Sequence, residues 1–418
     1  MAIEKAYLSQ SAIEGEMMIR RDAVIQNICD AVITQCIEAF GERIEALILT
    51  GSAARGESTI VSLDGGWKVL GDAEFLLVLR ETSTTTDAKL SDVVKRDSME
   101  KLRSQGILVV LDIGVVTESY LKKLPPHIFS FELLACGKIV SGDPRKLELI
   151  PRYTAGMISK EDAWRLLCNR MIEQLRFVHD LENSPIQLTP GLYYATVKLY
   201  LDMASSYLVF AGEYAPTYRE RAQRLSALAN KTRMETPFPL RKFAARVAEC
   251  TAWKLSGEEE DSDRRVEVWL EAVSYLRRLW RWELIQLTTN SQDTTIAGLT
   301  SHFSSQQSLS HRIRGWMSLV KRSGWLRSIS EWPRWLRLAF RSTPRYLVYQ
   351  SAAEVAFRLP CLIKHGGQPP RLNVDWREIR SRLPVLSTTS SSKSDSTWLG
   401  LVNDILWNYS HFLQDTRA

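Results

Sequence analysis

Three acidic side chains stand in strand-like stretches where apolar residues would pack better. Asp72 and Glu74 are separated by one residue in VLGDAEFLLVL, and Asp112 lies in the middle of ILVVLDIGVV. Side chains two apart on a strand point to the same face. Unpaired charge among apolar residues costs free energy, and a divalent cation held by carboxylate oxygens removes that cost. The spacing therefore predicts a three-carboxylate site for two Mg²⁺ ions that serves phosphoryl or nucleotidyl transfer.

A glycine-serine turn precedes these acids in the chain. The stretch LTGSAARGES, residues 49–58, reads as a strand that runs into a small, polar turn. Gly51 lets the backbone approach a ligand closely, and N–H groups exposed at such a turn bind phosphate oxygens. Ser52 adds a hydroxyl donor, and Arg55 adds a guanidinium that suits phosphate. We therefore expect Gly51, Ser52 and Arg55 to bind the phosphates of a nucleotide.

Each of these features also has an ordinary structural interpretation. A Gly-Ser pair after a strand is usually only a turn, and an acid-x-acid pair on a strand is more often a solvated face. Their conjunction in this order, with Asp112 inside a third apolar strand, is much rarer. The conjunction is what favours a catalytic site over a catalytically silent domain.

The elements expected around these residues form a mixed α/β core. In chain order they are a helix over 11–40, a strand over 44–52, two strands around the turn at 64–66, a helix over 84–106 and a strand over 107–116. From about Ser159 onward the periodicity is helical almost throughout. The fold class is therefore α+β, with a mixed-sheet domain over 1–150, a helical domain over 151–290 and a basic, tryptophan-rich helical region over 300–418.

The order of these motifs resembles the nucleotidyltransferase superfamily of DNA polymerase beta. The Gly-Ser turn, the acid-x-acid pair and the later single acid come in the order of that superfamily. GSAARGE is similar to the Gly-Ser-x-x-Arg-Gly form of its smaller bacterial members, with Arg55 and Gly56 at the matching positions. FELLACGKIVSGD resembles the helix-turn-strand that closes many such domains. GEYAPTYRERAQRL also looks like a family feature, with Arg219 and Arg221 either near the acceptor or merely on a surface. The resemblance covers about residues 10–145, with an inserted hairpin around 64–66 and Glu74 at a position where Asp is frequent.

The resemblance implies a Mg²⁺-dependent nucleotidyltransferase. An acceptor hydroxyl would attack the α-phosphorus of a nucleoside triphosphate such as ATP, and pyrophosphate would leave. Asp72 and Glu74 would bind both metals, for which Mn²⁺ can substitute. Asp112 would ligate the catalytic metal and help to deprotonate the acceptor.

The helical domain is expected to cover the nucleotide. Tyr194 and Lys198 are four residues apart in TPGLYYATVKLYLDMASSYLVF and share a helix face. Lys198 would reach the triphosphate, and Tyr194 or its neighbour Tyr193 would stack on the base. A core helix with a snorkelling lysine explains the same pattern equally well. Asp202 or Glu213 is a candidate general base, although no motif fixes either.

A basic stretch near the C-terminus raises a separate hypothesis. Residues 311–349 carry nine Lys or Arg against one acid, Glu331, interleaved with Trp316, Trp325, Trp332 and Trp335. Indole rings favour the headgroup level of a bilayer, and basic residues favour anionic lipid. The stretch therefore predicts peripheral membrane contact. RNA binding explains it less well because no RNA module is recognisable, and helix packing with a solvated basic face is the third alternative.

Charge and cysteine usage limit the functional class. The net charge is +6, but residues 1–150 carry 17 basic against 22 acidic residues, whereas residues 151–418 carry 37 against 26. An acidic catalytic half argues mildly against a nucleic-acid substrate. The six cysteines are scattered without a CxxC pair, which is typical of reduced thiols in a cytoplasmic protein. No run of about 18 apolar residues indicates a membrane span, so membrane contact would be peripheral, at the inner surface.

Three functions remain open at this point. We favour transfer of a nucleoside monophosphate to a small hydroxylated molecule or glycan precursor. The alternatives are nucleotidylation of a macromolecule, either a protein or an RNA, and a scaffold that binds nucleotide without catalysis. The motif does not specify the acceptor.

Overall fold

The computed structural model describes residues 2–80, 85–183, 187–231, 236–257, 266–288, 295–323, 331–364, 375–386 and 398–413. The chain forms two compact units. The first unit comprises Met1–Ser159, Glu213–Arg224 and Thr251–Glu260, and the second comprises Lys160–Gly212, Leu225–Cys250 and Asp261–Ala418. This division into two compact units does not test the three domains expected from the sequence, which stay a prediction.

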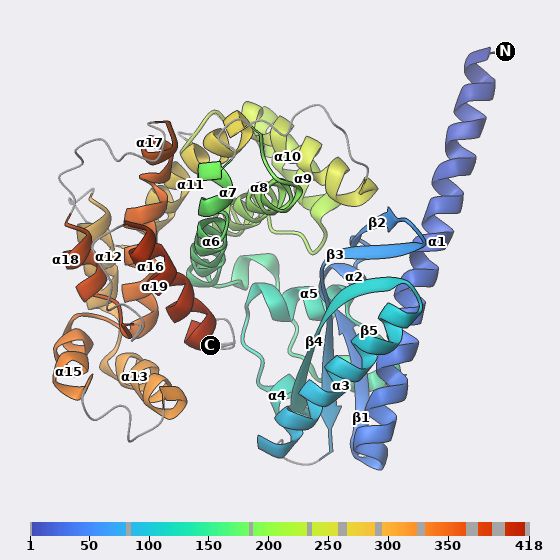
Figure 1. The fold of residues 1–418 in the computed structure, drawn as a ribbon, viewed down its shortest axis with the longest axis horizontal. Helices are drawn as coiled ribbons and strands as arrows, with labels where there is room; N and C mark the ends of the chain where they lie inside the picture. The colour runs from blue at the N-terminus through green and yellow to red at the C-terminus, as the bar shows by residue number, and fades with distance from the viewer. Residues whose placement is uncertain are drawn as a thin grey trace. The chain divides into compact units, whose positions relative to one another are not determined.

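The first unit is built on a five-stranded mixed sheet, drawn in blue and cyan in Figure 1. Its strands are β1 (Ile44–Thr50), β2 (Thr59–Leu63), β3 (Gly66–Leu79), β4 (Ile107–Thr117) and β5 (Lys138–Gly142). Strand β3 pairs antiparallel with β2 and β1 and parallel with β4, and β5 pairs antiparallel with β1. The mixed sheet and the hairpin around the Asp-Gly-Gly turn agree with the sequence analysis.

Strand β3 is long enough to pair with two strands in succession. Its first part, Gly66–Leu70, pairs with β2, and its last part, Glu74–Leu79, pairs with β1. The register with β4 shifts between Lys68 and Asp72, and Gly71 has φ +105°. This irregularity lies where β3 passes from one partner to the other, immediately before the predicted acids.

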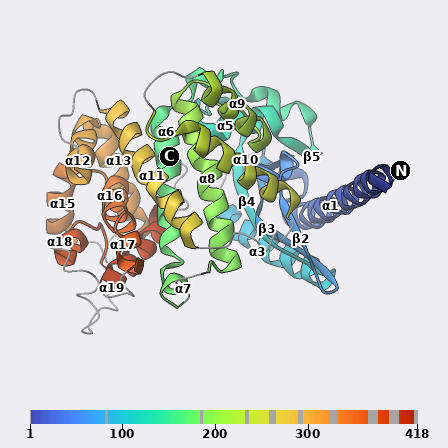
Figure 2. The same cartoon turned by 90° about the horizontal axis from the view of Figure 1, so that it is seen from above.

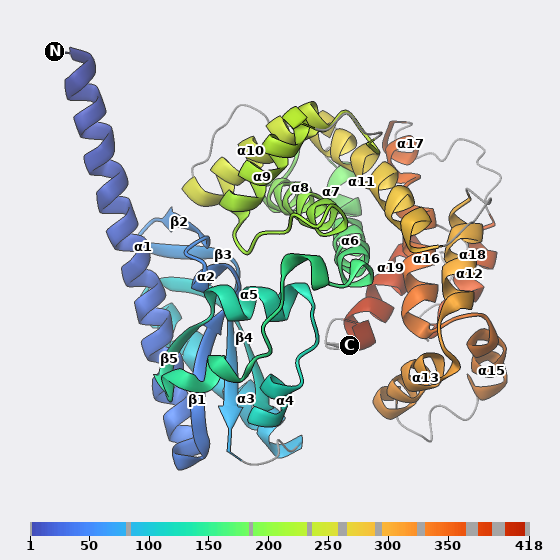
Figure 3. The same ribbon diagram turned by 180° about the vertical axis from the view of Figure 1, so that it is seen from behind.

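Helices cover both faces of the sheet. The helices of the first unit are α1 (Ala2–Phe40), α2 (Gly51–Ala54), α3 (Thr85–Ser104), α4 (Glu118–Lys122) and α5 (Ile128–Cys136), with 3₁₀ turns η1 (Gly41–Arg43), η2 (Pro144–Leu149) and η3 (Ala155–Met157). One core contains side chains of α1 and α3 together with Phe75 and Leu77 of β3. The other contains Leu76 and Val78 with side chains that follow β4. Figures 1 and 3 show α3 and α5 on opposite faces.

In the described part of the chain, the elements after Ser159 are helices. They are α6 (Lys160–Leu175), α7 (Val178–Asn183), α8 (Pro190–Phe210), α9 (Tyr218–Lys231), α10 (Leu240–Ser256), α11 (Val266–Leu287), α12 (Ile296–Gln306), α13 (Leu309–Ser323), α15 (Trp332–Arg341), α16 (Pro344–Ala356), α17 (Leu359–Lys364), α18 (Trp376–Ser381), α19 (Trp398–Asn408) and the π-helical turn η6 (Tyr409–Leu413). The start of α9 and the end of α10 belong to the first unit. The expected α+β class, with a mostly helical C-terminal region, matches these elements.

The core of the second unit is rich in aromatic rings. Trp164 of α6 is fully buried, and its ring centroid lies 5.1 Å from that of Phe303 and 5.8 Å from those of Tyr346 and Tyr349. Figure 2 shows α12, α13, α15 and α16, in orange, gathered at one end of this unit. Among the described residues, no helix is both long and apolar enough to cross a membrane.

Candidate active site

The three predicted carboxylates come from two adjacent parallel strands. Glu74 of β3 stands opposite Asp112 of β4 in the parallel register, and Asp72 precedes Glu74 by two residues. Because side chains alternate along each strand, all three project from one face of the sheet, the face on which Leu76 follows Glu74. The structure therefore places Asp72, Glu74 and Asp112 on the same patch of sheet.

The glycine-serine turn lies directly against Glu74. Thr50, the last residue of β1, stands opposite Glu74, and its Oγ1 donates to Glu74 Oε2 over 3.4 Å. The chain then turns at Gly51, which has φ +63° and begins α2. A Cβ atom at Gly51 would lie 2.6 Å from Glu74 Oε2. Glycine is thus required both by its left-handed backbone and by the carboxylate beside it, and half-buried Ser52 follows at once.

The three carboxylates differ in their surroundings. Burial raises the pKa of Glu74 above its ordinary value, and the charges of Asp72 and Asp112 raise it further. Arg55 acts in the opposite direction. Asp112 is half exposed and pairs with Lys95 of α3 at 3.3 Å, and Asp72 is exposed. Negative charge therefore accumulates around the most enclosed of the three carboxylates.

The donor chemistry suits a hard divalent cation, because carboxylate oxygens are the ligands that Mg²⁺ prefers. The side chains share a face but do not converge on one point. Within the residues that the structure describes, no three His, Cys, Asp or Glu side chains come together closely enough to hold a metal ion. Mutual repulsion of like charges favours such a separated arrangement.

The turn is joined to a buried ionic cluster through Arg55. The side chain of Arg55 is only 5% exposed, donating from Nε to Glu57 over 3.2 Å and from Nη1 to Glu132 of α5 over 2.5 Å. Glu132 also accepts from Arg221 of α9 and from the hydroxyl of Tyr214. Burial opposes the charge on Arg55, but Glu132 and its other neighbours raise the pKa, so the guanidinium stays charged. These contacts tie the turn to α5, and the expected binding of phosphate by Arg55 stays a prediction.

The same cluster anchors the start of α9. Glu57, also buried, accepts from the backbone N–H groups of Tyr218 at 2.9 Å and Arg219 at 3.1 Å. A carboxylate at these otherwise unpaired N–H groups stabilises a helix N-terminus. The guanidinium of Arg221 lies over the rings of Tyr214 and Tyr218, at 4.5 and 4.9 Å from their centroids. Three segments far apart in sequence therefore meet at one point of the first unit.

Sequence reasoning singled out Arg55 and Arg221 but assigned them to a ligand or a surface, and it missed Glu57, Glu132 and Tyr214. Glu57, Glu132, Tyr214 and Arg221 all lie within the stretches GSAARGE, FELLACGKIVSGD and GEYAPTYRERAQRL, which the resemblance had singled out. The available signal was the presence of charged residues in all three stretches. Which charges pair with which depended on the tertiary fold.

The predicted residues of the helical region are divided between the two units. Tyr194, Lys198 and Asp202 belong to the second unit, and Glu213 belongs to the first. Lys198 Nζ lies 5.8 Å from the ring centroid of Tyr194 on α8, so the two share a helix face as expected. Because they belong to the second unit, their binding of a nucleotide stays a prediction. Asp202 is buried and pairs with Arg170 at 2.6 Å. Glu213 belongs to the first unit and is exposed.

Comparisons with known proteins were made at the level of sequence and of structure. No protein-family model matches the chain, and no curated protein matches it. Among solved structures, it is similar to the spectinomycin adenyltransferase AAD(9) from Enterococcus faecialis, crystallised with ATP and spectinomycin. The two chains are 13% identical, with a TM-score of 0.34 over 60% of this chain and 98% of that one. At this TM-score the similarity carries no argument about the function of this chain.

Proposed function

We propose that the first unit transfers a nucleoside monophosphate from a nucleoside triphosphate, ATP in the first instance, to an acceptor hydroxyl. The observation that carries the proposal is the contact between Gly51 and Glu74 beside Asp72 and Asp112. Three carboxylates on one patch of sheet repel one another, which costs free energy. Binding of cations between the carboxylates and the phosphates of a nucleotide would offset that cost.

Asp72, Glu74 and Asp112 would hold Mg²⁺ or Mn²⁺. Such an ion would neutralise the charge that develops on phosphoryl oxygens and would lower the pKa of a bound hydroxyl. The turn at Gly51 and Ser52 would present N–H groups and a hydroxyl to the triphosphate. Arg55 would act as a positioning residue that keeps the turn in place through Glu57 and Glu132.

A small hydroxylated molecule or glycan precursor is the acceptor that the charge distribution favours. The first 150 residues, which contain the three carboxylates, carry 22 acidic against 17 basic residues. A polyanionic acceptor such as RNA would be repelled there. Nucleotidylation of a protein and non-catalytic nucleotide binding are the other outcomes of the test.

The test is transfer of label from each of four α-labelled nucleoside triphosphates in the presence of Mg²⁺ and cell extract. We expect one triphosphate to label an acceptor, and Asp72→Ala and Asp112→Asn each to abolish the labelling. The matched control is Asp64→Asn, which removes an exposed carboxylate from the β2–β3 turn of the same sheet. Equal labelling by Asp112→Asn would reject the assigned site, and labelled protein or RNA would identify a macromolecular acceptor.

Binding can be measured independently of turnover. Titration calorimetry with Mg²⁺ and a non-hydrolysable triphosphate should give a dissociation constant for the wild-type protein. Removal of Mg²⁺ by a chelator should weaken that binding, and so should Glu74→Gln. Unchanged binding by Glu74→Gln would place the nucleotide elsewhere, whereas intact binding without any transfer would favour the scaffold.

Two further predictions are separate from this site. A peripheral membrane contact through residues 311–349 depends on helices of the second unit. A cytoplasmic location depends on the cysteines, all six of which are unpaired thiols, four of them buried. Neither prediction depends on the carboxylates.

A further inference from the structure

Two tilted indoles join α13 and α15, two helices of the second unit. The ring centroids of Trp316 and Trp335 lie 6.0 Å apart, and both side chains are buried. Trp316 Nε1 donates to the carbonyl of Ser342 over 3.0 Å, and Trp335 Nε1 donates to that of Pro384 over 2.7 Å. These two tryptophans, which had been expected to contact a membrane, instead fix the pair of helices within the unit.

Each helix keeps a second apolar stripe outside this core. Leu309, Ile313 and Met317 lie at i, i+4 and i+8 on α13, and all three are exposed. Trp332, Leu336 and Phe340 repeat that spacing on α15. Residues four apart lie on one side of a helix, so each set forms a continuous stripe. Leu309 is 70% exposed and Phe340 84%, the highest value for a large apolar side chain in the described part of the chain.

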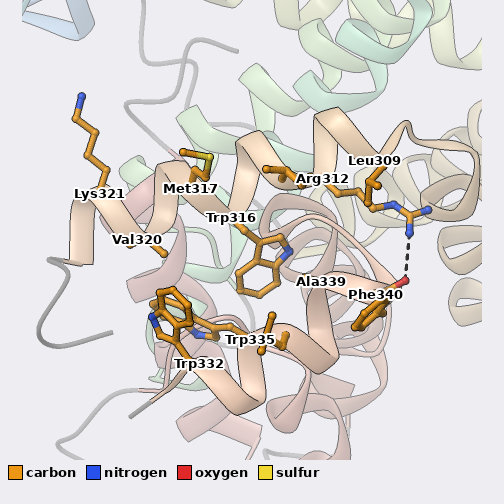
Figure 4. A pocket seen from close by; sticks show the side chains of 12 residues that line it. Leu309, Arg312, Trp316, Met317, Val320, Lys321, Trp332, Trp335, Ala339 and Phe340 are labelled. Atoms are coloured by element: carbon orange, nitrogen blue, oxygen red, sulfur yellow. Dashed lines mark hydrogen bonds between the residues drawn. The ribbon is translucent and has the colours of Figure 1, made fainter. Parts of the chain in front are cut away.

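A groove of about 530 Å³ separates the two stripes. Figure 4 shows α13 and α15 side by side, with Trp316 and Trp335 between them and Met317 and Phe340 farther out. Apolar side chains dominate the lining, and Arg312 and Lys321 of α13 also contribute to it. Continuous exposed apolar surface next to polar residues is the kind of surface through which proteins bind partners or membranes.

The surface carries positive charge on its flanks. The described segments 309–323 and 331–341 contain seven Lys or Arg and one acid, Glu331, which pairs with Arg334 at 3.2 Å. Arg312 donates to the carbonyl of Phe340 over 3.1 Å, and a neutral carbonyl does not cancel the charge. Arg337 and Arg341 each follow a residue of the α15 stripe and so lie one step around the helix from it.

We propose that α13 and α15 dock on an anionic lipid surface, with both stripes inserted among the acyl chains and the basic residues at the phosphate level. Interfacial helices carry this combination of an apolar face with Trp, Phe and Leu and a polar face with Lys and Arg. The indoles of Trp316 and Trp335 stay in the protein and set the spacing of the stripes.

A bilayer fits this surface better than an acidic helix from a protein partner. A helix from a protein partner would lie in the groove and cover its floor. Phe340 projects from α15 with most of its side chain exposed, and such a helix would have to offer a pocket for the phenyl ring. Fluid lipid accommodates a protruding phenyl ring without a complementary pocket.

The segment that docks is shorter than the expected 311–349, because Tyr346 and Tyr349 of α16 are buried against Trp164.

The experiment is co-sedimentation of the full-length protein with sucrose-loaded vesicles. Vesicles of phosphatidylcholine alone and of phosphatidylcholine with one quarter phosphatidylglycerol would be compared at physiological and at high salt. We expect binding to the anionic vesicles that falls as salt rises, because the basic residues are screened. Failure of the wild-type protein to bind anionic vesicles at physiological salt would overturn the proposal.

Variants test the apolar stripe of α15 and the basic residues beside it separately. Leu336→Glu combined with Phe340→Glu should abolish binding, and Arg337→Glu combined with Arg341→Glu should weaken it at least tenfold and reduce the salt dependence. The controls are Ile37→Glu, an exposed apolar residue of α1, and Lys89→Glu, an exposed lysine of α3. Both controls should bind like the wild-type protein.

All the substituted side chains are exposed, so unchanged melting temperatures are expected and would be verified first. Equal binding by the Leu336→Glu and Phe340→Glu double variant would contradict insertion of the α15 stripe. Tight binding of an acidic amphipathic peptide without any binding to vesicles would assign the surface to a protein partner. Because this inference uses only the second unit, it stands or fails independently of the nucleotidyl transfer.

Discussion

Gly51 is the residue whose replacement distinguishes a structural from a functional role of the turn. Gly51→Ala and Gly56→Ala both force an L side chain into a left-handed backbone, with φ +63° and +69°, at a cost of about 1–2 kcal/mol each. A Cβ at Gly56 meets nothing within 4 Å, whereas at Gly51 it displaces the carboxylate of Glu74. We therefore expect Gly51→Ala to lose at least as much stability as Gly56→Ala, because it adds the contact with Glu74 to the same backbone cost.

The same pair should differ in activity. Displacement of a reacting group by about 1 Å can cost roughly 100-fold in rate. Gly51→Ala should lose label transfer on that scale, and Gly56→Ala should retain it. Chemical denaturation and the transfer assay measure the two effects. Equal activity of both variants would show that the position of Glu74 does not matter.

Glu74 also predicts how stability depends on pH. Burial, with Asp72 and Asp112, raises the pKa of Glu74 in the folded protein above its ordinary value of 4.5. Between these two pKa values the folded state binds more protons than the unfolded state, so this group makes stability fall as pH rises through that window. Above the window the penalty is constant, and below pH 4.5 it is absent.

Glu74→Gln should therefore raise the melting temperature at pH 7, and the gain should shrink toward pH 4. Asp64→Asn, at an exposed position, should show no such pH-dependent gain. Melting curves across this pH range make the comparison. A lower melting temperature for Glu74→Gln at pH 7 would mean that other contacts of the carboxylate outweigh its burial.

At the scale of elements, Glu132 links α5 to the turn after β1 and to α9. It accepts from Arg55 and Arg221, both nearly inaccessible to solvent. Removing one partner of a buried ion pair leaves charge without compensation and costs about 3–5 kcal/mol. We expect Glu132→Gln to lower the free energy of unfolding of the first unit by about 3 kcal/mol, measured by urea denaturation.

The matched comparison is an exposed ion pair of the same unit. Asp97 accepts from Arg96 at 3.0 Å, and the side chain of Arg96 is 61% exposed. Such pairs contribute at most about 1 kcal/mol. Asp97→Asn should therefore change the stability far less than Glu132→Gln. A similar small effect of both would mean that the cluster is solvated enough to tolerate the loss.

At the scale of the whole molecule, the division into two compact units predicts separable stability. Trp164 is fully buried among four aromatic rings of the second unit, and truncation of such a side chain costs about 3–5 kcal/mol. We expect Trp164→Ala to accelerate amide hydrogen exchange in α6, α8, α11 and α16 while the sheet of the first unit keeps its protection.

Trp407→Ala is the control for this experiment, because Trp407 is 40% exposed and stacks on His411 at 4.5 Å. Its effect on exchange should be small and confined to α19. Faster exchange throughout β1, β3 and β4 in Trp164→Ala would show that the two units unfold as one.

The sequence predicted most of the elements because local patterns determine them. Apolar runs within 58–79 and 107–116 predicted strands, the Asp-Gly-Gly turn predicted a hairpin, and helical periodicity predicted the helices after Ser159. The helix expected over 11–40 is part of a longer one, α1. Element ends depend on contacts as well as on pattern, which explains such differences.

What the sequence determined by itself is the chemistry available: three carboxylates at strand spacing, a glycine-serine turn before them, and a basic, tryptophan-rich stretch after them. Only the tertiary structure decided which groups meet. Strand register placed Glu74 opposite Asp112, and the antiparallel pairing of β1 put Gly51 against Glu74. It also turned Arg55 toward Glu132 and buried Trp316 and Trp335. The reason is physical: residue spacing sets the direction of a side chain along its own element, whereas its partner is set by long-range packing that no local pattern encodes.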